Sequence, residues 1–139
     1  MTTTHIVAFA LYLAVLAALL YYGVIYLLQR TFMPYHQAAV GKKWEELDPR
    51  LQALLTGMQE IMGAGMLTPV AAGLFILFVP FRRGEPWASW AMLAMLLVLG
   101  LPTIYATRLI NRRTGADTPV LPSVVSVVVS VLAFVVSQL

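Results

Sequence analysis

Four long apolar runs restrict this chain to a helical membrane protein. They cover residues 6–28, 54–81, 87–107 and 120–136, and short polar segments separate them. A helix needs about 20 apolar residues, in a range of about 17–25, to cross the ~30 Å hydrocarbon core of a bilayer. Transmembrane β-strands are shorter and alternate in polarity, so these runs exclude a barrel. The predicted fold is an all-α bundle of four transmembrane helices.

Composition leads to the same class. Hydrophobic residues make up 60% of the 139 residues and charged residues only 11%, whereas soluble domains carry about 25% charged residues. Such a chain cannot cover a water-facing surface, so lipid is its expected solvent. The length leaves room for one integral membrane domain over residues 1–139.

The first apolar run is expected to stay in the protein. The residues before it include no Lys or Arg, and the run is longer than the apolar part of a secretory signal. It also lacks a small-residue cleavage site before Arg30.

The basic residues predict an orientation. Seven lie in the first and third connections, against two in the second. Lys and Arg accumulate in cytoplasmic loops, so both termini are expected outside, and a bacterial inner membrane is the expected location. The net charge of +3 is assigned to contact with anionic membrane lipids rather than nucleic acid. The seven residues are Arg30, Lys42, Lys43, Arg50, Arg108, Arg112 and Arg113.

The connections differ in length. Residues 31–50 are predicted to form a long cytoplasmic loop, whereas 82–86 form a tight turn with Gly84 and Pro86 as helix breakers. Asp48 is a residue type preferred at a helix N-cap, and Pro49 is a type preferred at the first helical position. The second long helix is therefore predicted to begin there, before its membrane span.

Glu60 is the most unusual residue, because residues 51–81 contain no other ionisable side chain. Acidic groups within a membrane are costly and often functional. Two interpretations remain open. The span 61–81 is complete without Glu60, so the carboxylate can lie at headgroup depth in contact with water. Alternatively, it shares a face with small residues that admit a neighbouring helix, and then it points at protein. That face comprises Ala53, Gly57, Ala64, Thr68 and Ala71.

Several polar residues are expected near Glu60 at the cytoplasmic end. Arg30 and Arg108 are candidate charge partners, and tyrosine hydroxyls can complete the hydrogen bonds. The alternative is an aromatic belt at the membrane interface, which would also include Tyr21, with Trp87 and Trp90 in the opposite belt. The candidate ligand-binding residues are Glu60, Tyr22, Tyr26, Tyr105, Arg108 and His36.

Two patterns concern helix packing. Pro69 and Pro102 fall inside predicted helices, where each removes a backbone hydrogen bond and can free a carbonyl that lines a cavity. Serines at 123, 126, 130 and 137 recur on one face of the last helix, and we interpret this seam as a packing face.

Cofactor and metal sites are not expected. The chain has no cysteine, which excludes thiolate ligands and thiol redox chemistry. Its two histidines, His5 and His36, are predicted on opposite sides of the membrane. No catalytic residue is assigned, and enzymatic activity is not the favoured interpretation.

Three function classes remain open. The first is binding or translocation of a lipophilic or amphiphilic small molecule in a pocket near the cytoplasmic end. The second is an accessory subunit that joins a homo-oligomer or a larger membrane complex. The third is a lipid-modifying enzyme that uses His36 or Glu60 as acid or base.

Overall fold

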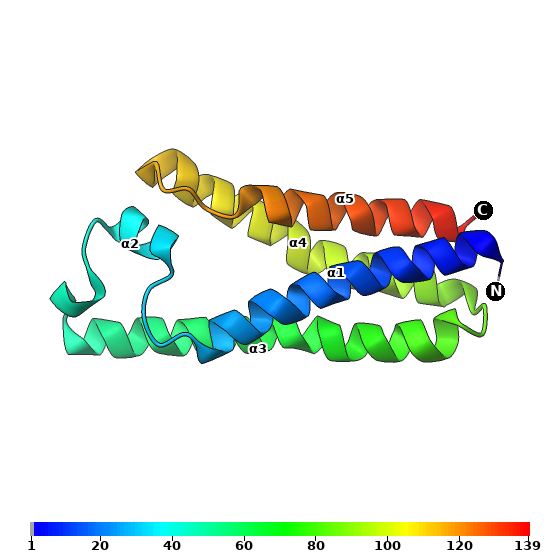
Figure 1. Ribbon diagram of the computed structural model, residues 1–139, viewed down its shortest axis with the longest axis horizontal. Coiled ribbons are helices and arrows are strands. Elements are labelled where there is room, and N and C mark those ends of the chain that lie inside the picture. Colours follow the sequence, from blue (N-terminus) through cyan, green and yellow to red (C-terminus); the bar gives the residue numbers. More distant parts are fainter. Residues whose placement is uncertain (1) are drawn as a thin grey trace.

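The computed structural model describes residues 2–139, so Met1 lies outside the described residues. Four long helices lie side by side in one bundle (Figure 1). All four are long and apolar enough to cross a membrane, which confirms the predicted fold class and the membrane location. They are α1 (Thr3–Leu28), α3 (Pro49–Ile76, continued by the π-helical turn η2, Leu77–Phe81), α4 (Pro86–Thr114) and α5 (Val120–Ser137).

Local chemistry sets the helix ends. The Asp48 carboxylate accepts a hydrogen bond from the Arg50 backbone N–H at 2.8 Å, and Pro49 occupies the first turn. The prediction that the second long helix begins here is confirmed. The turn before α4 contains Gly84 at φ +75°, a left-handed conformation that favours glycine.

The prediction of a long loop over residues 31–50 is wrong. A short linker, residues 29–33, joins α1 to a further helix, α2 (Pro34–Val40), and a 3-10 turn, η1 (Trp44–Glu46), follows. Pro34 suggests a loop in the sequence, but proline fits the first turn of a helix because an N–H there has no intrahelical acceptor, so none is lost when proline lacks it. Gly41, at φ +71°, then ends α2 in the left-handed conformation.

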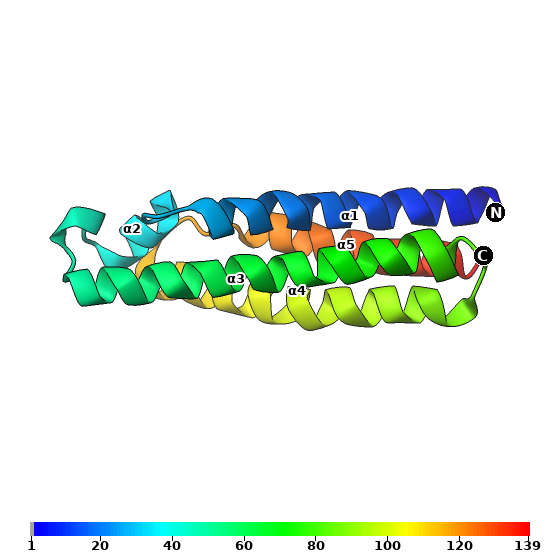
Figure 2. The ribbon, with the colours of Figure 1, turned by 90° about the horizontal axis from the view of Figure 1, so that it is seen from below.

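The four long helices meet closely at one end and separate at the other. Near the two termini α1 lies beside α5; toward α2 it diverges from α5 while α3 continues alongside it (Figures 1 and 2). The principal helix pairs are α1 with α3, α1 with α5, and α4 with α5. The bundle therefore has a closed end at the termini and an open end at α2.

Glycines allow α1 and α3 to cross at short range. A Cβ on Gly63 would lie 2.6 Å from the Leu27 backbone N and 2.9 Å from the Gly23 carbonyl O, closer than real atoms approach. Such backbone proximity is typical of small-residue helix contacts in membranes. Gly63 is therefore required at the crossing.

The face of α3 that carries the small residues and Glu60 does not pack against the other helices of the bundle. Ala53, Ala64, Thr68 and Ala71 are exposed. The side buried within the bundle is rotated from it and carries Gln59, Gly63, Val70 and Gly73. Both faces contain small residues at helical spacing, so spacing alone does not distinguish them.

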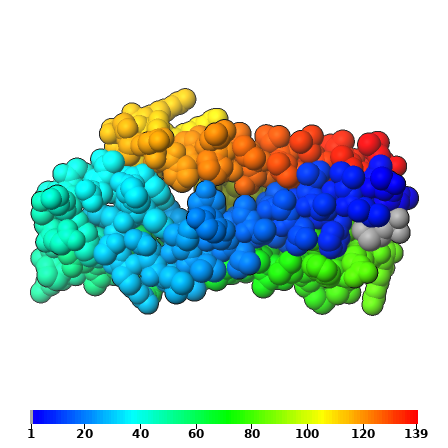
Figure 3. All heavy atoms as spheres, in the orientation of Figure 1, coloured from blue at the N-terminus to red at the C-terminus, as the bar shows by residue number. Residues whose placement is uncertain are grey.

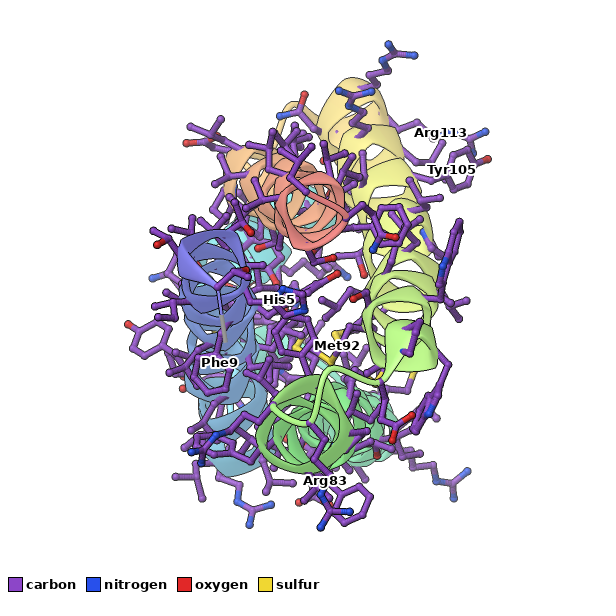
Figure 4. The ribbon with its side chains drawn as sticks, turned by 90° about the vertical axis from the view of Figure 1, so that its right-hand side faces the viewer. His5, Phe9, Arg83, Met92, Tyr105 and Arg113 are labelled. Carbon is purple, nitrogen blue, oxygen red and sulfur yellow. The ribbon has the colours of Figure 1, made fainter. Side chains whose placement is uncertain are left out.

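The closed end holds the densest core. Tyr12 is fully buried, donates a hydrogen bond from its hydroxyl to the Ser89 carbonyl at 3.3 Å and meets the Phe81 ring edge-on. Figure 4 shows His5 and Met92 pointing inward among the helices, and the His5 ring lies 5.4 Å from that of Phe81. Aromatic and sulfur-containing side chains thus fill the space between helices here.

Candidate ligand-binding cavity

A cavity of about 350 Å³ lies at the open end of the bundle. All four long helices and α2 contribute to its wall. Figure 3 shows the surface hollowed between α2, the second half of α1 and the first half of α5. The floor includes Val15, Leu96 and Ser130, which are buried at the edge of the closed-end core. The cavity therefore occupies the space left where α1 and α5 diverge.

One face of each long helix supplies the wall. On α1 this face carries Leu19, Tyr22 and Tyr26 at spacings of three and four, as helical geometry requires. The matching face of α4 carries Thr103 and Thr107. The α5 face carries three members of the serine seam, Ser123, Ser126 and Ser130. The seam thus borders the cavity in its first part, whereas Ser130 and Ser137 are buried in the bundle, as expected of a packing face.

The short helix α2 closes the outer end with Tyr35 and His36. The His36 ring makes edge-on contacts with Tyr35 at 4.3 Å, Phe32 at 6.1 Å and Tyr26 at 6.2 Å between centroids. Burial among these rings lowers the pKa of His36, because an imidazolium loses hydration there. His36 therefore faces the cavity as a neutral imidazole near pH 7.

Hydrogen bonds hold α2 and its flanking segments in place. The Gln59 amide Nε2 donates to the Thr31 carbonyl at 3.3 Å, and the Gln52 amide Nε2 donates to the Trp44 carbonyl at 2.8 Å. Phe32 and Trp44 meet edge-on at 5.1 Å. The segment between α1 and α3 is thereby fastened to α3 at both ends.

Three of the predicted site residues meet at the cavity: Tyr22, Tyr26 and His36. Tyr26 is only 7% exposed, which is unusual for a member of an interfacial belt. By contrast, Tyr21 is 62% exposed and Tyr105 is 70% exposed. The structure thus divides the four tyrosines of the candidate belt into an inward pair, Tyr22 and Tyr26, and an outward pair, Tyr21 and Tyr105.

The other three predicted site residues lie outside the cavity wall. Glu60 forms an ion pair with Arg30, and the two side chains are 43% and 66% exposed. Arg108 is exposed on α4, and Figure 4 shows Tyr105 pointing outward. Glu60 is thus partly exposed, as in the first interpretation, and it also pairs with Arg30, one of its two candidate charge partners.

The cavity also includes polar residues that were not predicted, mainly Thr103, Thr107 and Ser123. Thr103 and Thr107 are four residues apart, which places two hydroxyls on one face of α4. That spacing, read beside the serine seam, was the signal that could have indicated two facing polar walls. Which helices face each other is a tertiary property, so the pairing was not evident.

The wall carries no formal charge. Among residues 2–139, none of the Asp, Glu, Lys or Arg side chains lines the cavity. Nor do His, Asp and Glu residues of this part of the chain form a cluster of three that could hold a metal ion. The cavity thus offers apolar surface, hydroxyls and one imidazole.

Fold and cavity together define a four-span helical membrane protein with an uncharged, partly polar cavity between its helices. Comparison with protein-family models, with curated proteins and with solved structures finds no match. The cavity is therefore the feature from which a function can be inferred.

Proposed function

We propose that this protein binds a lipophilic or amphiphilic small molecule in the cavity at the open end of the bundle. The observation that carries the proposal is the cavity itself: about 350 Å³, mostly apolar, with a few converging polar groups. Ligand sites in proteins typically have this composition and fall within ~300–1,000 Å³. Helix bundles commonly form such sites between facing helices.

The position of the cavity supports a ligand dissolved in the membrane. Its α1 wall extends from Val15 to Tyr26, within a helix long and apolar enough to span the bilayer. The hollow between α1 and α5 (Figure 3) opens on the side of the bundle. A lipophilic molecule can therefore enter laterally from one leaflet without crossing water.

We further propose that the open end faces the cytoplasm of a bacterial cell and both termini face outward. The uneven distribution of Lys and Arg between connections supports this orientation. Because the chain has no cysteine, single cysteines placed at Lys42 and Arg83 can be tested separately with a membrane-impermeant thiol reagent. Labelling of the Arg83 position alone in intact cells is expected; the reverse pattern would overturn the orientation.

Filling the cavity tests the binding proposal. Gly65 lines the cavity, and a Cβ there would meet no atom within 4 Å, so Gly65→Phe can place a ring in open space. The matched control is Gly57→Phe, because Gly57 lies on the same helix with equally open space but does not line the cavity. Ser126→Leu fills the cavity from the opposite wall.

The measurement is native mass spectrometry of purified protein incubated with a total lipid extract. Wild type and Gly57→Phe should retain a small lipophile, and Gly65→Phe and Ser126→Leu should lose it. Thermal unfolding checks that all four proteins are folded. Equal retention by the filled and control variants would overturn the proposal.

The accessory-subunit alternative has one supporting observation, the exposed face of Ala64, Thr68 and Ala71 on α3. Small residues on a lipid-facing surface allow close approach of another helix. Loss of a co-purifying protein in Ala64→Leu, with lipophile retention unchanged, would favour that function.

A further inference from the structure

The hydrogen bonds within the cavity wall restrict the kind of molecule it can accept. Thr103 donates its hydroxyl proton to the Leu99 carbonyl at 2.7 Å, and Thr107 donates to the Thr103 carbonyl at 2.8 Å. On α5, Ser123 donates to the Pro119 carbonyl at 3.0 Å, and Ser130 to the Ser126 carbonyl at 2.7 Å. A hydroxyl has one proton to donate but two lone pairs. These four residues therefore offer the cavity only acceptor oxygens.

A backbone carbonyl is a further candidate acceptor. Pro69 lies inside α3 and has no N–H, so it cannot donate to the carbonyl four residues earlier. That carbonyl belongs to Gly65, a residue of the cavity wall. The internal proline of α4, Pro102, has the corresponding effect on Val98, which is 75% exposed and lies outside the wall. Of Pro69 and Pro102, only Pro69 thus leaves a carbonyl of a cavity-wall residue without its helical donor.

The absence of charge sets a second restriction. No Asp, Glu, Lys or Arg of the described chain lines the cavity. A charged group taken from water into such a place is strongly disfavoured unless it is paired. Carboxylate, phosphate and ammonium head groups therefore have no counter-ion here.

The size of the cavity sets a third restriction on the ligand. At the ~30 Å³ that one water molecule occupies in the liquid, the cavity of about 350 Å³ accommodates about a dozen non-hydrogen atoms. One medium-length chain or a small ring system fits within the wall. The two acyl chains of a membrane phospholipid are larger than the cavity and would extend out through its lateral opening.

We propose that the ligand is an uncharged single-chain or cyclic lipophile whose head group is a hydrogen-bond donor, an alcohol in the simplest case. Its hydroxyl donates to the acceptor oxygens of Thr103, Thr107 or Ser123, and its apolar body extends toward the floor at Val15 and Leu96. The His36 imidazole and the hydroxyls of Tyr22 and Tyr26 can donate to the oxygen of the same head group. This inference rests on the proposed function, since it specifies the occupant of the same cavity.

Four probes of matched chain length test the inference: 1-decanol, decyl methyl ether, decanoate and decylammonium. Binding to the protein in lipid nanodiscs is measured at neutral pH by competition against the lipophile retained from the lipid extract. Decanol should bind at least about fivefold more tightly than its methyl ether, the ratio expected from one hydrogen bond of about 1 kcal/mol. Both ions should bind more weakly than decanol.

Two threonine variants test whether a hydroxyl of the cavity wall accepts the hydrogen bond from decanol. Thr107→Val keeps the shape of the side chain but removes the acceptor oxygen, and should reduce the preference for decanol over the ether. Thr68→Val is the matched control, because the Thr68 hydroxyl also donates to its own helix, to the Ala64 carbonyl at 3.0 Å, but is exposed and outside the cavity. Thermal unfolding of both variants checks their folding.

The outcomes separate this inference from the proposed function. Equal binding of decanol and ether, or tighter binding of either ion, would overturn the donor inference while leaving a lipophile site. If filling the cavity with Gly65→Phe leaves lipophile retention unchanged, the proposed function fails and the inference fails with it. Loss of the decanol preference in Thr107→Val, with the preference intact in Thr68→Val, would establish the inference.

Discussion

The two ends of this bundle use the same four helices differently. At the closed end, Tyr12, Phe81 and Met92 fill the interior and are 0–2% exposed. At the open end, α1 diverges from α5, and hydroxyl-bearing residues border a cavity of about 350 Å³. The closed end maximises packing, which stabilises helix association in lipid. The open end lacks that packing, as the proposed ligand site requires.

The largest expected difference between the ends comes from removing one leucine from each. Leu16 is 1% exposed in the closed-end core, whereas Leu19 borders the cavity three residues later. Leu16→Ala should lower the free energy of unfolding by about 2–5 kcal/mol, because it creates a void in a filled core. Leu19→Ala should cost less, because space already exists beside it. Unfolding in SDS titrations measures both, and equal losses would show that the ends do not differ in packing.

The next effect concerns the close contact between α1 and α3 at the open end, where Gly63 meets Gly23 and Leu27. Gly63→Ala should destabilise the protein by about 1–3 kcal/mol, since its Cβ would lie 2.6 Å from a backbone atom of α1. Gly57→Ala is the control: it has open space and should stabilise the helix by up to about 1 kcal/mol. The same titration reports both changes. A neutral Gly63→Ala would mean that α1 and α3 are not in close contact.

The histidines give a pH test, since His5 lies at the closed end and His36 at the open end. Burial lowers the pKa of His36, so docking of α2 favours the neutral ring. Stability from docking is complete above the ordinary pKa of about 6.5 and is lost as the pH falls through that value toward the lowered one. Protonation of His36 adds a single proton. The equilibrium constant for docking of α2 therefore falls by at most about tenfold for every tenfold rise in proton concentration.

Hydrogen–deuterium exchange of residues 34–40, corrected for the intrinsic pH dependence of exchange, measures this effect. Protection should fall between about pH 7.5 and pH 5.5. The pH dependence should persist in His5→Gln and disappear in His36→Gln. If it persists in His36→Gln, another group causes it.

The smallest effect is expected at Glu60. An exposed ion pair contributes about 0–1 kcal/mol, and Glu60 lies outside the cavity wall. Glu60→Gln should therefore leave lipophile retention within about twofold of wild type and change stability by less than about 1 kcal/mol. A large loss of retention with intact folding would return Glu60 to the ligand site.

Residues with strong local signals were predictable. The four apolar runs indicate their helices without reference to any partner, and Asp48 with Pro49 marks the start of α3. Tyr22 and Tyr26 share a helix face by spacing alone. Pro34 shows the limit of such reasoning, because the same residue type begins α2 here and lies inside α3 and α4 at Pro69 and Pro102.

The sequence by itself determined the solvent and the secondary structure of this protein, because hydropathy and local capping depend on neighbours along the chain. Only the tertiary structure decided which face of α3 is buried, that α1 and α5 diverge, and that Tyr22, Tyr26 and His36 lie at a cavity while Glu60 pairs with Arg30 outside it. Those features depend on how helices cross. A few backbone contacts, such as that between Gly63 and Leu27, determine the crossing, and residues far apart in the sequence form them.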